Sequence, residues 1–445
     1  MHGWKDDANQ SAFAGVKSEF DNVYRTNFAE VKARPGRRWT GRRVLRYIRD
    51  IRDHSFYLKQ GHPSPALANR IGENLPILTR FAVRNPCIRW AFLPLVSSRP
   101  VQKALEYIER TVLPPEHIVD WLNEVRPDVM VASPFIMDRS KELDWVKAAI
   151  SLNIPTVASV ASWDNLTTKG IFHILPDLVF VWNMALVEEA NQLHDIPLHR
   201  LCITGSPTFD FWFGMSATMD RESFCQQIGI DPTNPFITYL SSSTTIAGDE
   251  TPAVREFTEA LAEHPETKNV IVVVRPHPLN ADIWDDFSQE NVVVWPRGGE
   301  IPEWGDTQQN YYHSIVHAAA VVGVNTSAFL DAAVLGKPCL TILTERYRAV
   351  QEQLGHFYHL LNGDFLDVVR ENDQAAEAIA GFMKGIDPKE GDRRRFVQDF
   401  LRPMGIDKPA TPVMADAILA AAEGRNMNPA NSVLASSRPS EMVTT

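Results

Sequence analysis

The nine residues VVVRPHPLN, at positions 272–280, decide the fold of the second half of the chain. Three consecutive valines are typical of a strand that is buried on both faces, as the strands of a parallel sheet are. Pro276 and Pro278 end that strand, because proline fixes its own backbone and cannot donate a hydrogen bond to the sheet. The pattern therefore places Arg275 and His277 where a parallel sheet opens onto a ligand crevice.

Short apolar strands alternate with helical stretches from residue 128 onward. The first series contains DVMVASPF, IPTVASVAS, DLVFVWN and HRLCITGSP, and the second contains PFITYLSSS, NVIVVVRPHP, NVVVWP, AVVGVN and PCLTIL. This alternation predicts parallel α/β sheets. The aromatic, Pro/Gly-punctuated stretch SPTFDFWFGMSATMD (206–220) separates the two series. We interpret it as the connection between two domains.

The predicted fold class is α/β, with two Rossmann-like domains facing across a cleft. We expect a helical, irregular N-terminal segment of the acceptor domain at 1–125 and the acceptor domain's Rossmann-like part at 126–212. A nucleotide-donor domain is expected at 213–425, followed by a polar tail without periodicity at 426–445, which we expect to be disordered. A length of 445 residues agrees with two domains.

The charge of the chain is unevenly distributed. The net charge is −11, yet Lys32 to Lys59 contain ten Lys/Arg and two Asp, a local charge of +8 that leaves −19 for the remainder. The rest of the protein is therefore strongly acidic and is expected to bind nucleic acid poorly. The basic stretch predicts a helix with an apolar stripe, formed by Val44, Tyr47, Ile48 and Ile51. This helix either docks on the N-terminal domain or rests on an anionic membrane or acceptor.

Neither a membrane span nor a metal site is predicted. No apolar run approaches the roughly 20 residues of a span, and MHGWKDDANQ lacks the layout of a signal peptide, so we expect a cytoplasmic protein. The four cysteines contain no Cys-x-x-Cys pair and are expected to be reduced packing residues. His313 and His317 have zinc-ligand spacing, but no third ligand is in register.

A second stretch with candidate functional residues is AAAVVGVNTSAFLDAAVLGKPCLTIL, at 318–343. The predicted strand ends in Asn325, Thr326 and Ser327, and a helix follows. The free N–H groups and the dipole at the start of a helix suit a phosphate. These residue types are also ordinary N-caps, so both interpretations remain open.

The third stretch is VASVASWDNLTTKG, at 157–170. A buried strand leads into a polar loop that contains Trp163, Asp164, Asn165 and Lys169. An aspartate at the carboxyl end of a strand could accept a proton from a substrate hydroxyl. The alternative is an Asx-type turn, in which Asp164 bonds its own backbone.

Together these motifs resemble the GT-B class of nucleotide-dependent transferases, and within it the CDP-glycerol glycerophosphotransferases and related capsule polysaccharide glycosyltransferases. That family has a strand ending in His-Pro, here His277-Pro278. About fifty residues later it has a Ser/Thr pair opening a helix, here Thr326-Ser327, and then a Lys-Pro, here Lys337-Pro338. In the family the His-Pro and the Ser/Thr pair hold the donor's pyrophosphate or nucleotide.

The N-terminal half resembles the family more loosely. The family loop WHG…K…G is similar to 163–170, and GxPRxD is similar to 205–210. The family's catalytic-loop histidine corresponds to Asp164, and because acidic bases are normal in inverting glycosyl transfer, this change favours a sugar donor. The first 80 residues lack the strand and glycine-bearing loop that usually open a GT-B protein, so either the acceptor domain is reduced or the chain begins late.

The resemblance implies a metal-independent glycosyltransferase, or a glycerophosphotransferase-like enzyme, in bacterial surface polysaccharide synthesis. It would move a group from a nucleotide-activated donor to a hydroxyl of a glycan or lipid-linked acceptor, with no cofactor besides that donor. The absence of an Asp-x-Asp motif agrees with metal independence. Asp164 and His277 are the expected catalytic residues. The expected donor-binding residues are Arg275, Asn325, Thr326, Ser327, Ser241, Ser242 and Lys337, and the expected acceptor-side residues are Trp163, Asn165, Lys169 and Asp138.

Two other functions remain open. A UDP-sugar 2-epimerase of the same fold also contacts a nucleotide diphosphate, and it would need several acidic and histidine residues facing one sugar ring. Asp138, Asp164 and His173 are the candidates for that set. The second of these functions is that of a non-catalytic GT-B-like scaffold, and the missing first strand favours it.

Overall fold

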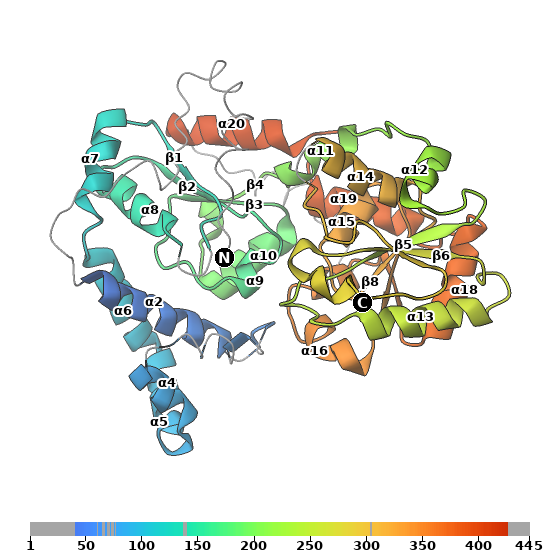
Figure 1. The fold of residues 1–445 in the computed structure, drawn as a ribbon. Helices are drawn as coiled ribbons and strands as arrows, with labels where there is room; N and C mark the ends of the chain where they lie inside the picture. Colours follow the sequence, from blue (N-terminus) through green and yellow to red (C-terminus); the bar gives the residue numbers. More distant parts are fainter. Residues whose placement is uncertain are drawn as a thin grey trace, which may run out of the picture.

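The computed structural model describes residues 41–59, 61–64, 67, 68, 72, 75, 77–136, 140–302 and 305–425 (Figure 1). Two predictions therefore lie outside the described residues: the acceptor-side role of Asp138 and the disordered tail at 426–445. Each predicted series of strands forms one parallel sheet. The α/β class with two Rossmann-like domains is confirmed.

The N-terminal domain is built on a four-stranded sheet of order β1-β2-β3-β4. Its strands are β1 (Met130–Ala132), β2 (Thr156–Ser159), β3 (Leu178–Val181) and β4 (Leu201–Ile203). The helices that connect or precede them are α7 (Glu116–Val125), α8 (Glu142–Ser151), α9 (Asn165–Thr168) and α10 (Met184–His194). All four residues of β2 are buried, so its carboxyl end delivers the loop at 160–164 from a rigid element.

The C-terminal domain is built on a six-stranded sheet of order β10-β9-β8-β5-β6-β7. Its strands are β5 (Phe236–Leu240), β6 (Ile271–Arg275), β7 (Val292–Val294), β8 (Val321–Gly323), β9 (Cys339–Ile342) and β10 (Leu366–Val369). Its helices are α12 (Arg221–Ile228), α13 (Thr251–Glu263), α14 (Gly305–Val316), α15 (Ala328–Val334), α16 (Arg348–Gln351), α17 (Tyr358–Leu361), α18 (Asn372–Met383) and α19 (Glu390–Leu401).

The strand in the opening motif is buried on both faces. Val272 and Val274 belong to the core that includes residues of α13 and α18, whereas Val273 packs with residues of α12 on the other face. All three valines are fully buried. Strand β5 lies between β6 and β8, which brings the carboxyl ends of these three strands to one edge of the sheet.

Two elements of the C-terminal half differ from the sequence prediction. The edge strand β10 is not among the predicted strand-like segments, because Asp367 interrupts its apolar pattern. The last helix, α20 (Ala410–Ala422), lies along the N-terminal domain (Figure 1). Its Ala417 and Ala421 pack against Val157 and Phe180 of the first sheet. The range 213–425 expected for the donor domain therefore includes a helix that belongs to the other domain.

The segment between the two sheets connects the two domains, and hydrogen bonds to Asp210 hold it in place. It contains α11 (Asp210–Gly214), and Asp210 accepts hydrogen bonds from Arg402 and from the backbone of Ala410 and Thr411. The predicted connection at 206–220 is thus held by the turn between α19 and α20.

The N-terminal helical segment begins, in the described part of the chain, with the basic helix α2 (Gly41–Tyr57). Its predicted apolar stripe is wrong in part: Ile48 is buried, but Val44 and Tyr47 are exposed. Two of its arginines face inward: Arg49 pairs with Glu109 and Asp144, and the side chain of Arg52 is buried. These acidic partners, on α6 (Arg99–Thr111) and α8, turn the helix away from its expected orientation. Contact between α2 and a membrane stays a prediction.

Later in the described part of this segment come α4 (Ile77–Arg84), α5 (Pro86–Ser97) and α6 (Arg99–Thr111). Helices α4 and α5 project from the body of the N-terminal domain (Figure 1). Within the described residues, no helix combines the length and the apolar character needed to cross a bilayer.

Candidate functional site

Three loops of the C-terminal domain meet at the carboxyl edge of its sheet. The first follows β5, where the Ser241 hydroxyl accepts a hydrogen bond from the backbone N–H of His277 at 2.8 Å. The Ser242 hydroxyl donates to the backbone carbonyl of Asn325 at 2.9 Å. The carboxylate of Glu250 accepts the Ser242 N–H, and burial raises the Glu250 pKa to about 7. Ser241 and Ser242 thus join the His-Pro loop to the loop after β8.

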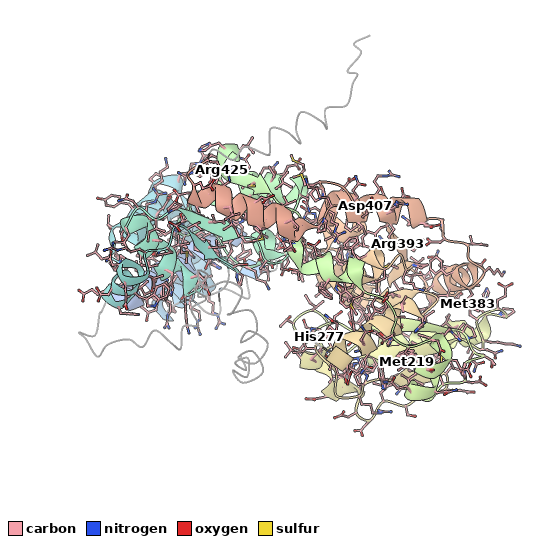
Figure 2. All side chains as sticks on the ribbon, turned by 90° about the horizontal axis from the view of Figure 1, so that it is seen from above. Met219, His277, Met383, Arg393, Asp407 and Arg425 are labelled. Carbon is pink, nitrogen blue, oxygen red and sulfur yellow. The ribbon has the colours of Figure 1, made fainter. Side chains whose placement is uncertain are left out.

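His277 is presented from this edge with a defined tautomer. Its Nδ1 accepts the backbone N–H of Leu279 at 3.1 Å. Burial lowers the His277 pKa, so the ring is neutral at pH 7. A neutral ring whose Nδ1 accepts carries its proton on Nε2. His277 lies on the side of the C-terminal domain nearer the N-terminal domain (Figure 2), where Nε2–H can donate to a ligand.

Arg275, the other residue of the opening motif, is held inside the domain. Its guanidinium lies over the rings of Trp295 and Tyr311, at 5.2 and 5.3 Å from their centroids, and near Glu300 at 3.7 Å. Only 4% of the residue is exposed, and burial lowers its pKa to about 10. The backbone carbonyl of Arg275 accepts the Ser241 N–H. Arg275 therefore supports the loop rather than reaching a ligand directly.

Of the three polar residues that follow β8, two have structural roles and one has a hydroxyl that a ligand could reach. Asn325 is buried, and its side-chain amide donates to the backbone carbonyl of Val350. The Thr326 hydroxyl accepts the backbone N–H of Ala328 at 3.3 Å, as a cap does. Ser327 is exposed at the start of α15 and makes no side-chain capping bond. Of these three residues after β8, all predicted to bind the donor, Ser327 is the one whose hydroxyl is exposed to a ligand.

Lys337 is not brought to this edge. Helix α15 runs back across the sheet, so Lys337 lies just before β9, at the amino ends of the strands. Its Nζ donates to the backbone carbonyl of Ala318, which precedes β8. The donor-binding role expected for Lys337 disagrees with this position. The Lys-Pro pair instead closes the turn into β9.

The half-buried carboxylate of Asp331, in α15, predicts a pH-dependent stability. Tyr311 donates to Asp331 at 2.7 Å, yet burial raises the Asp331 pKa to about 7 from an ordinary 3.8. The resulting stabilisation is complete below pH 4 and is lost as the pH rises through 7. Relative to Asp331→Asn, the wild-type free energy of unfolding should fall by about 2–4 kcal/mol between pH 4 and 8. Urea melts across this range measure it, and parallel pH profiles would contradict it.

Asp164 occupies the loop after β2 in the N-terminal domain and precedes the short helix α9. Its carboxylate accepts the Thr168 hydroxyl at 2.9 Å and lies 3.2 Å from the Lys169 ammonium. Burial opposes ionisation, but Lys169, Ser162, His356 and Thr168 together hold the Asp164 pKa below its ordinary value. With 19% of the side chain exposed, Asp164 is an ionised carboxylate that solvent or a substrate can reach.

The neighbours of Asp164 have mainly structural roles. The Asn165 side chain is buried, and its carbonyl accepts the backbone N–H groups of Ala161 and Ser162, each at 3.1 Å. Asn165 therefore holds the loop in shape, and little of its buried side chain is accessible to an acceptor. Trp163 is also buried. Lys169 is exposed and is the predicted acceptor-side residue that remains accessible.

Sequence reasoning missed His356, which the C-terminal domain contributes to this cluster. Its ring lies 5.1 Å from the ring of Trp163, and the Asp164 charge acts on it. Burial nevertheless lowers the His356 pKa to about 4, so the ring is neutral at pH 7. Its buried Nδ1 has no hydrogen-bond partner among the described residues. An unpaired polar atom beside an ionised carboxylate marks this contact as a candidate catalytic centre.

The segment that carries His356 connects both halves of the candidate site. Val350, whose carbonyl accepts the Asn325 amide, lies in α16 on the same segment. The backbone N–H of Gly355 donates to the Ser64 hydroxyl at 2.8 Å. His359 and Tyr358 each approach the same Glu189 oxygen at 2.7 Å. The sequence GHFYH at 355–359 was a signal that could have been noticed: its two histidines flank an aromatic pair.

A pocket of about 210 Å³ opens next to Lys169 in the N-terminal domain. It is enclosed by α2, by the loop after β1 and by the loop after α9. Its apolar wall includes Phe135, Ile136 and Ile171, and its polar wall includes Lys169 and His173. The carboxylate of Asp53 fixes the polar wall by accepting the backbone N–H of Ile171 at 3.0 Å and contacting His173.

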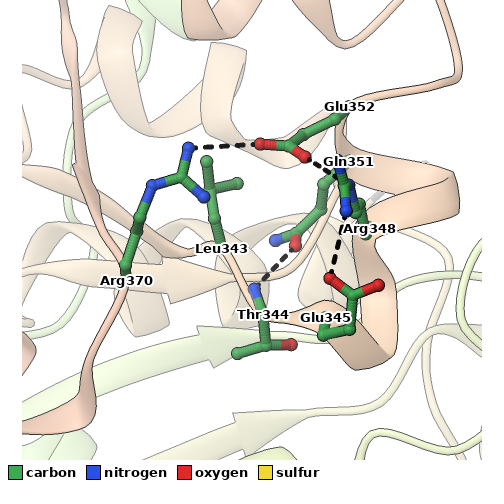
Figure 3. Close-up of a pocket in the computed structure, with 7 residues that line it drawn as sticks. All are labelled: Leu343, Thr344, Glu345, Arg348, Gln351, Glu352 and Arg370. Carbon is green, nitrogen blue, oxygen red and sulfur yellow. Dashed lines mark hydrogen bonds and ion pairs between the residues drawn. The ribbon is translucent and has the colours of Figure 1, made fainter.

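A second pocket, of about 260 Å³, lies at the carboxyl ends of β9 and β10 (Figure 3). Its two arginines are already paired: Arg370 contacts Glu352 at 3.2 Å, and Arg348 contacts Glu352 and Glu345 at 3.1 and 3.3 Å. Because each positive charge has a carboxylate partner, we do not place the donor phosphates in this pocket.

The described residues contain no cluster of three His, Cys, Asp or Glu side chains arranged to hold a metal ion. His313 and His317 stack on each other, and their Nε2 atoms approach the backbone of Thr218 and Met219. Their helical spacing therefore serves the packing of α14 on the segment before α12.

No protein-family model matches the chain, and none of the curated proteins searched matches it. Similar solved structures include the UDP-GlcNAc 2-epimerase of Methanocaldococcus jannaschii, at 14% identity over 73% of this chain and 83% of that one, with a TM-score of 0.44. The Neisseria meningitidis UDP-GlcNAc 2-epimerase bound to UDP-GlcNAc is 14% identical over 71% and 81%, with a TM-score of 0.47. A variant of the wall teichoic acid polymerase TagF is 12% identical over 59% and 60%, with a TM-score of 0.37. At these identities the likeness concerns the fold and not the activity.

Proposed function

We propose that the protein transfers a group from a nucleotide-activated donor to a hydroxyl acceptor. The observation that carries the proposal is that the two domains meet next to Asp164, where the ring of His356 lies against Trp163 and the Asp164 charge acts on it. One domain supplies an ionised carboxylate there, and the other supplies a neutral imidazole with an unpaired nitrogen. The same C-terminal domain presents His277 after β6 and Ser327 after β8, the two strands on either side of β5.

The proposed donor site uses neutral hydrogen-bond donors. A diphosphate leaving group gathers negative charge as the bond to the transferred group breaks. In this proposal the Nε2–H of His277 and the Ser327 hydroxyl donate hydrogen bonds to that charge; the Nδ1 bond of His277 and the uncapped Ser327 hydroxyl support it. Donors fixed before the reaction stabilise such charge without reorganisation. The supporting loop is rigid, because Ser241 and Ser242 tie it to two neighbouring strands.

The proposed acceptor side is the pocket beside Lys169. An acceptor hydroxyl that reached Asp164 from this pocket would pass its proton to the carboxylate as the new bond formed. The apolar wall formed by Phe135, Ile136 and Ile171 suits the face of a sugar ring or the start of a lipid chain. On the resemblance of the motifs, the acceptor proposed is a glycan or lipid-linked acceptor of bacterial surface polysaccharide synthesis, used in the cytoplasm.

A second candidate function is epimerisation of a UDP-sugar. It is favoured by the acidic and histidine side chains near the domain contact, since His359, which is paired with Glu189, lies near the Trp163 ring as His356 does. An epimerase would abstract and return a proton on one sugar and would need no acceptor. The two functions therefore differ in their requirement for a second substrate.

The proposal predicts that a nucleotide-activated donor stabilises the folded protein. The expected result is a higher melting temperature with one of the CDP-, CMP-, UDP-, GDP- or dTDP-linked donors, since a ligand at 100 times its Kd adds about 2.7 kcal/mol. Transfer should then require an added hydroxyl acceptor, measured as release of the nucleotide. Turnover of a UDP-sugar without acceptor would support the epimerase instead. Binding of none of these donors would support the scaffold and overturn both enzymes.

A further inference from the structure

Helix α5 is apolar but does not bury its side chains in the protein. Its sequence, PCIRWAFLPLVS, has one charged residue, Arg89. None of its described side chains, at 87–97, is buried. Trp90 is 75% exposed and Leu95 is 62% exposed. Large exposed apolar residues grouped on one element mark an interaction surface, because isolated ones are common but contiguous patches are not.

The preceding helix extends the same surface. Helix α4 packs against α5, and its Phe81 is 60% exposed. One side of α5 packs against α2 and α6, which fixes the pair on the N-terminal domain. The pair projects away from the C-terminal domain (Figure 1), so an extended surface could approach its tip without contacting the candidate site. We call α4 and α5, residues 77–97, the apolar hairpin.

The charge of this region indicates what the hairpin contacts. Residues 77–105 contain five basic side chains and no acidic one. These basic residues are Arg80, Arg84, Arg89, Arg99 and Lys103. The rest of the chain is acidic, since the net charge of the whole protein is −11. A partner that selects this region must therefore be apolar and negatively charged at once, and an anionic lipid surface has both properties.

We propose that the apolar hairpin inserts into the surface of an anionic membrane and holds the protein there. Twelve residues of helix extend about 18 Å, too short for a hydrocarbon core of about 30 Å. The hairpin therefore lies within the interface of one leaflet rather than crossing it. Trp90, Phe81 and Leu95 enter the boundary between headgroups and acyl chains, as such side chains do in interfacial helices. Arg89 and Arg99 remain at the level of the lipid phosphates.

Cys87 provides a direct readout at the hairpin. It is exposed on α5, whereas Cys202, Cys225 and Cys339 are buried. A thiol-reactive, environment-sensitive dye on the intact protein should therefore label Cys87. We expect its emission to shift to shorter wavelength with vesicles of phosphatidylglycerol and phosphatidylcholine, and to stay unchanged with phosphatidylcholine alone. Protein that sediments with the anionic vesicles while the dye emission stays that of water would overturn the insertion.

Cosedimentation of variants tests the residues. Trp90→Glu combined with Leu95→Glu should weaken binding to the anionic vesicles at least ten-fold. Arg89→Gln and Arg99→Gln should each weaken it roughly five-fold, with smaller effects at high salt. Leu419→Glu is the matched control, because Leu419 is an exposed leucine on α20 (58%), away from the hairpin. It should bind as the wild type does, and all variants should keep the wild-type melting temperature because the changed side chains are exposed.

Two further results would overturn the proposal. One is a Trp90→Glu/Leu95→Glu protein that binds the vesicles as tightly as the wild type. The other is a wild-type protein that does not bind lipid but forms a dimer, measured by analytical ultracentrifugation, which the same double variant dissociates. That second result would assign the hairpin to self-association. Neither result depends on catalysis, so the test is independent of the proposed function.

Discussion

Replacement of Asp164 by Asn is expected to lower turnover by 100-fold or more while leaving the affinity for the donor unchanged. The carboxylate is ionised at neutral pH because the charge of Lys169 and the hydrogen bonds from Ser162 and Thr168 oppose the effect of its burial. An amide of the same shape keeps the hydrogen bond from Thr168 but cannot accept a proton, and a positioned base contributes typically 10²–10⁴-fold. Initial rates with saturating donor and acceptor, together with donor titrations by calorimetry, measure the two quantities separately.

The matched control for this substitution is Asp128→Asn. Asp128 is an exposed aspartate of the same domain, located before β1 at the opposite edge of the sheet. It should keep the wild-type rate. A wild-type rate in Asp164→Asn would instead remove Asp164 from the proposed chemistry and leave His356 as the group to test. Loss of both turnover and donor binding would assign Asp164 to the donor rather than to the acceptor.

Replacement of His277 by Ala is expected to lower kcat/KM by about 10- to 100-fold, the effect of losing one hydrogen bond to a charged group, about 1.5–3 kcal/mol. The imidazole is neutral, and its Nε2–H is free to donate because Nδ1 accepts the backbone N–H of Leu279. His277→Gln should recover part of the loss, since its amide can donate from a similar position. Steady-state kinetics with varied donor concentration measure both variants.

His264→Ala is the control for the second substitution. His264 lies in the same domain at the end of α13 and contacts Glu377 at 3.1 Å, remote from the carboxyl edge of the sheet. It should leave kcat/KM unchanged. Equal kcat/KM values for His277→Ala and the wild type would contradict a donor-side role for the His-Pro motif. Equal losses in His277→Ala and His264→Ala would point to a general effect on stability.

The order of apolar and polar residues was enough to predict the fold class. Buried valines at 272–274, together with the strand-like segments on either side, predict parallel sheets because such strands need apolar residues on both faces. The same rule failed for β10, where Asp367 sits in an edge strand that needs less burial. The sequence also predicted which loops follow strand ends, and three of them do meet through Ser241 and Ser242.

The direction of each side chain was decided by tertiary structure. Arg275 ends a strand, as predicted, but its guanidinium lies over the rings of Trp295 and Tyr311 inside the domain. The elements that pack beside a strand determine whether a side chain at its end is buried or faces a ligand. Lys337 follows the Ser/Thr pair in sequence, yet α15 carries it to the other edge of the sheet.

The ring contact between Trp163 and His356, and the electrostatic interaction of His356 with Asp164, join residues nearly two hundred positions apart, on different domains. The order of apolar and polar residues in a segment shows which of its faces is buried. The sequence alone was therefore enough to predict the two sheets and the loops at the ends of their strands. Such a local pattern contains no information on which loop of one domain meets which loop of the other. That pairing depends on how the domains pack, and here the packing is fixed by contacts such as Ser64 with Gly355 and Asn183 with Phe400.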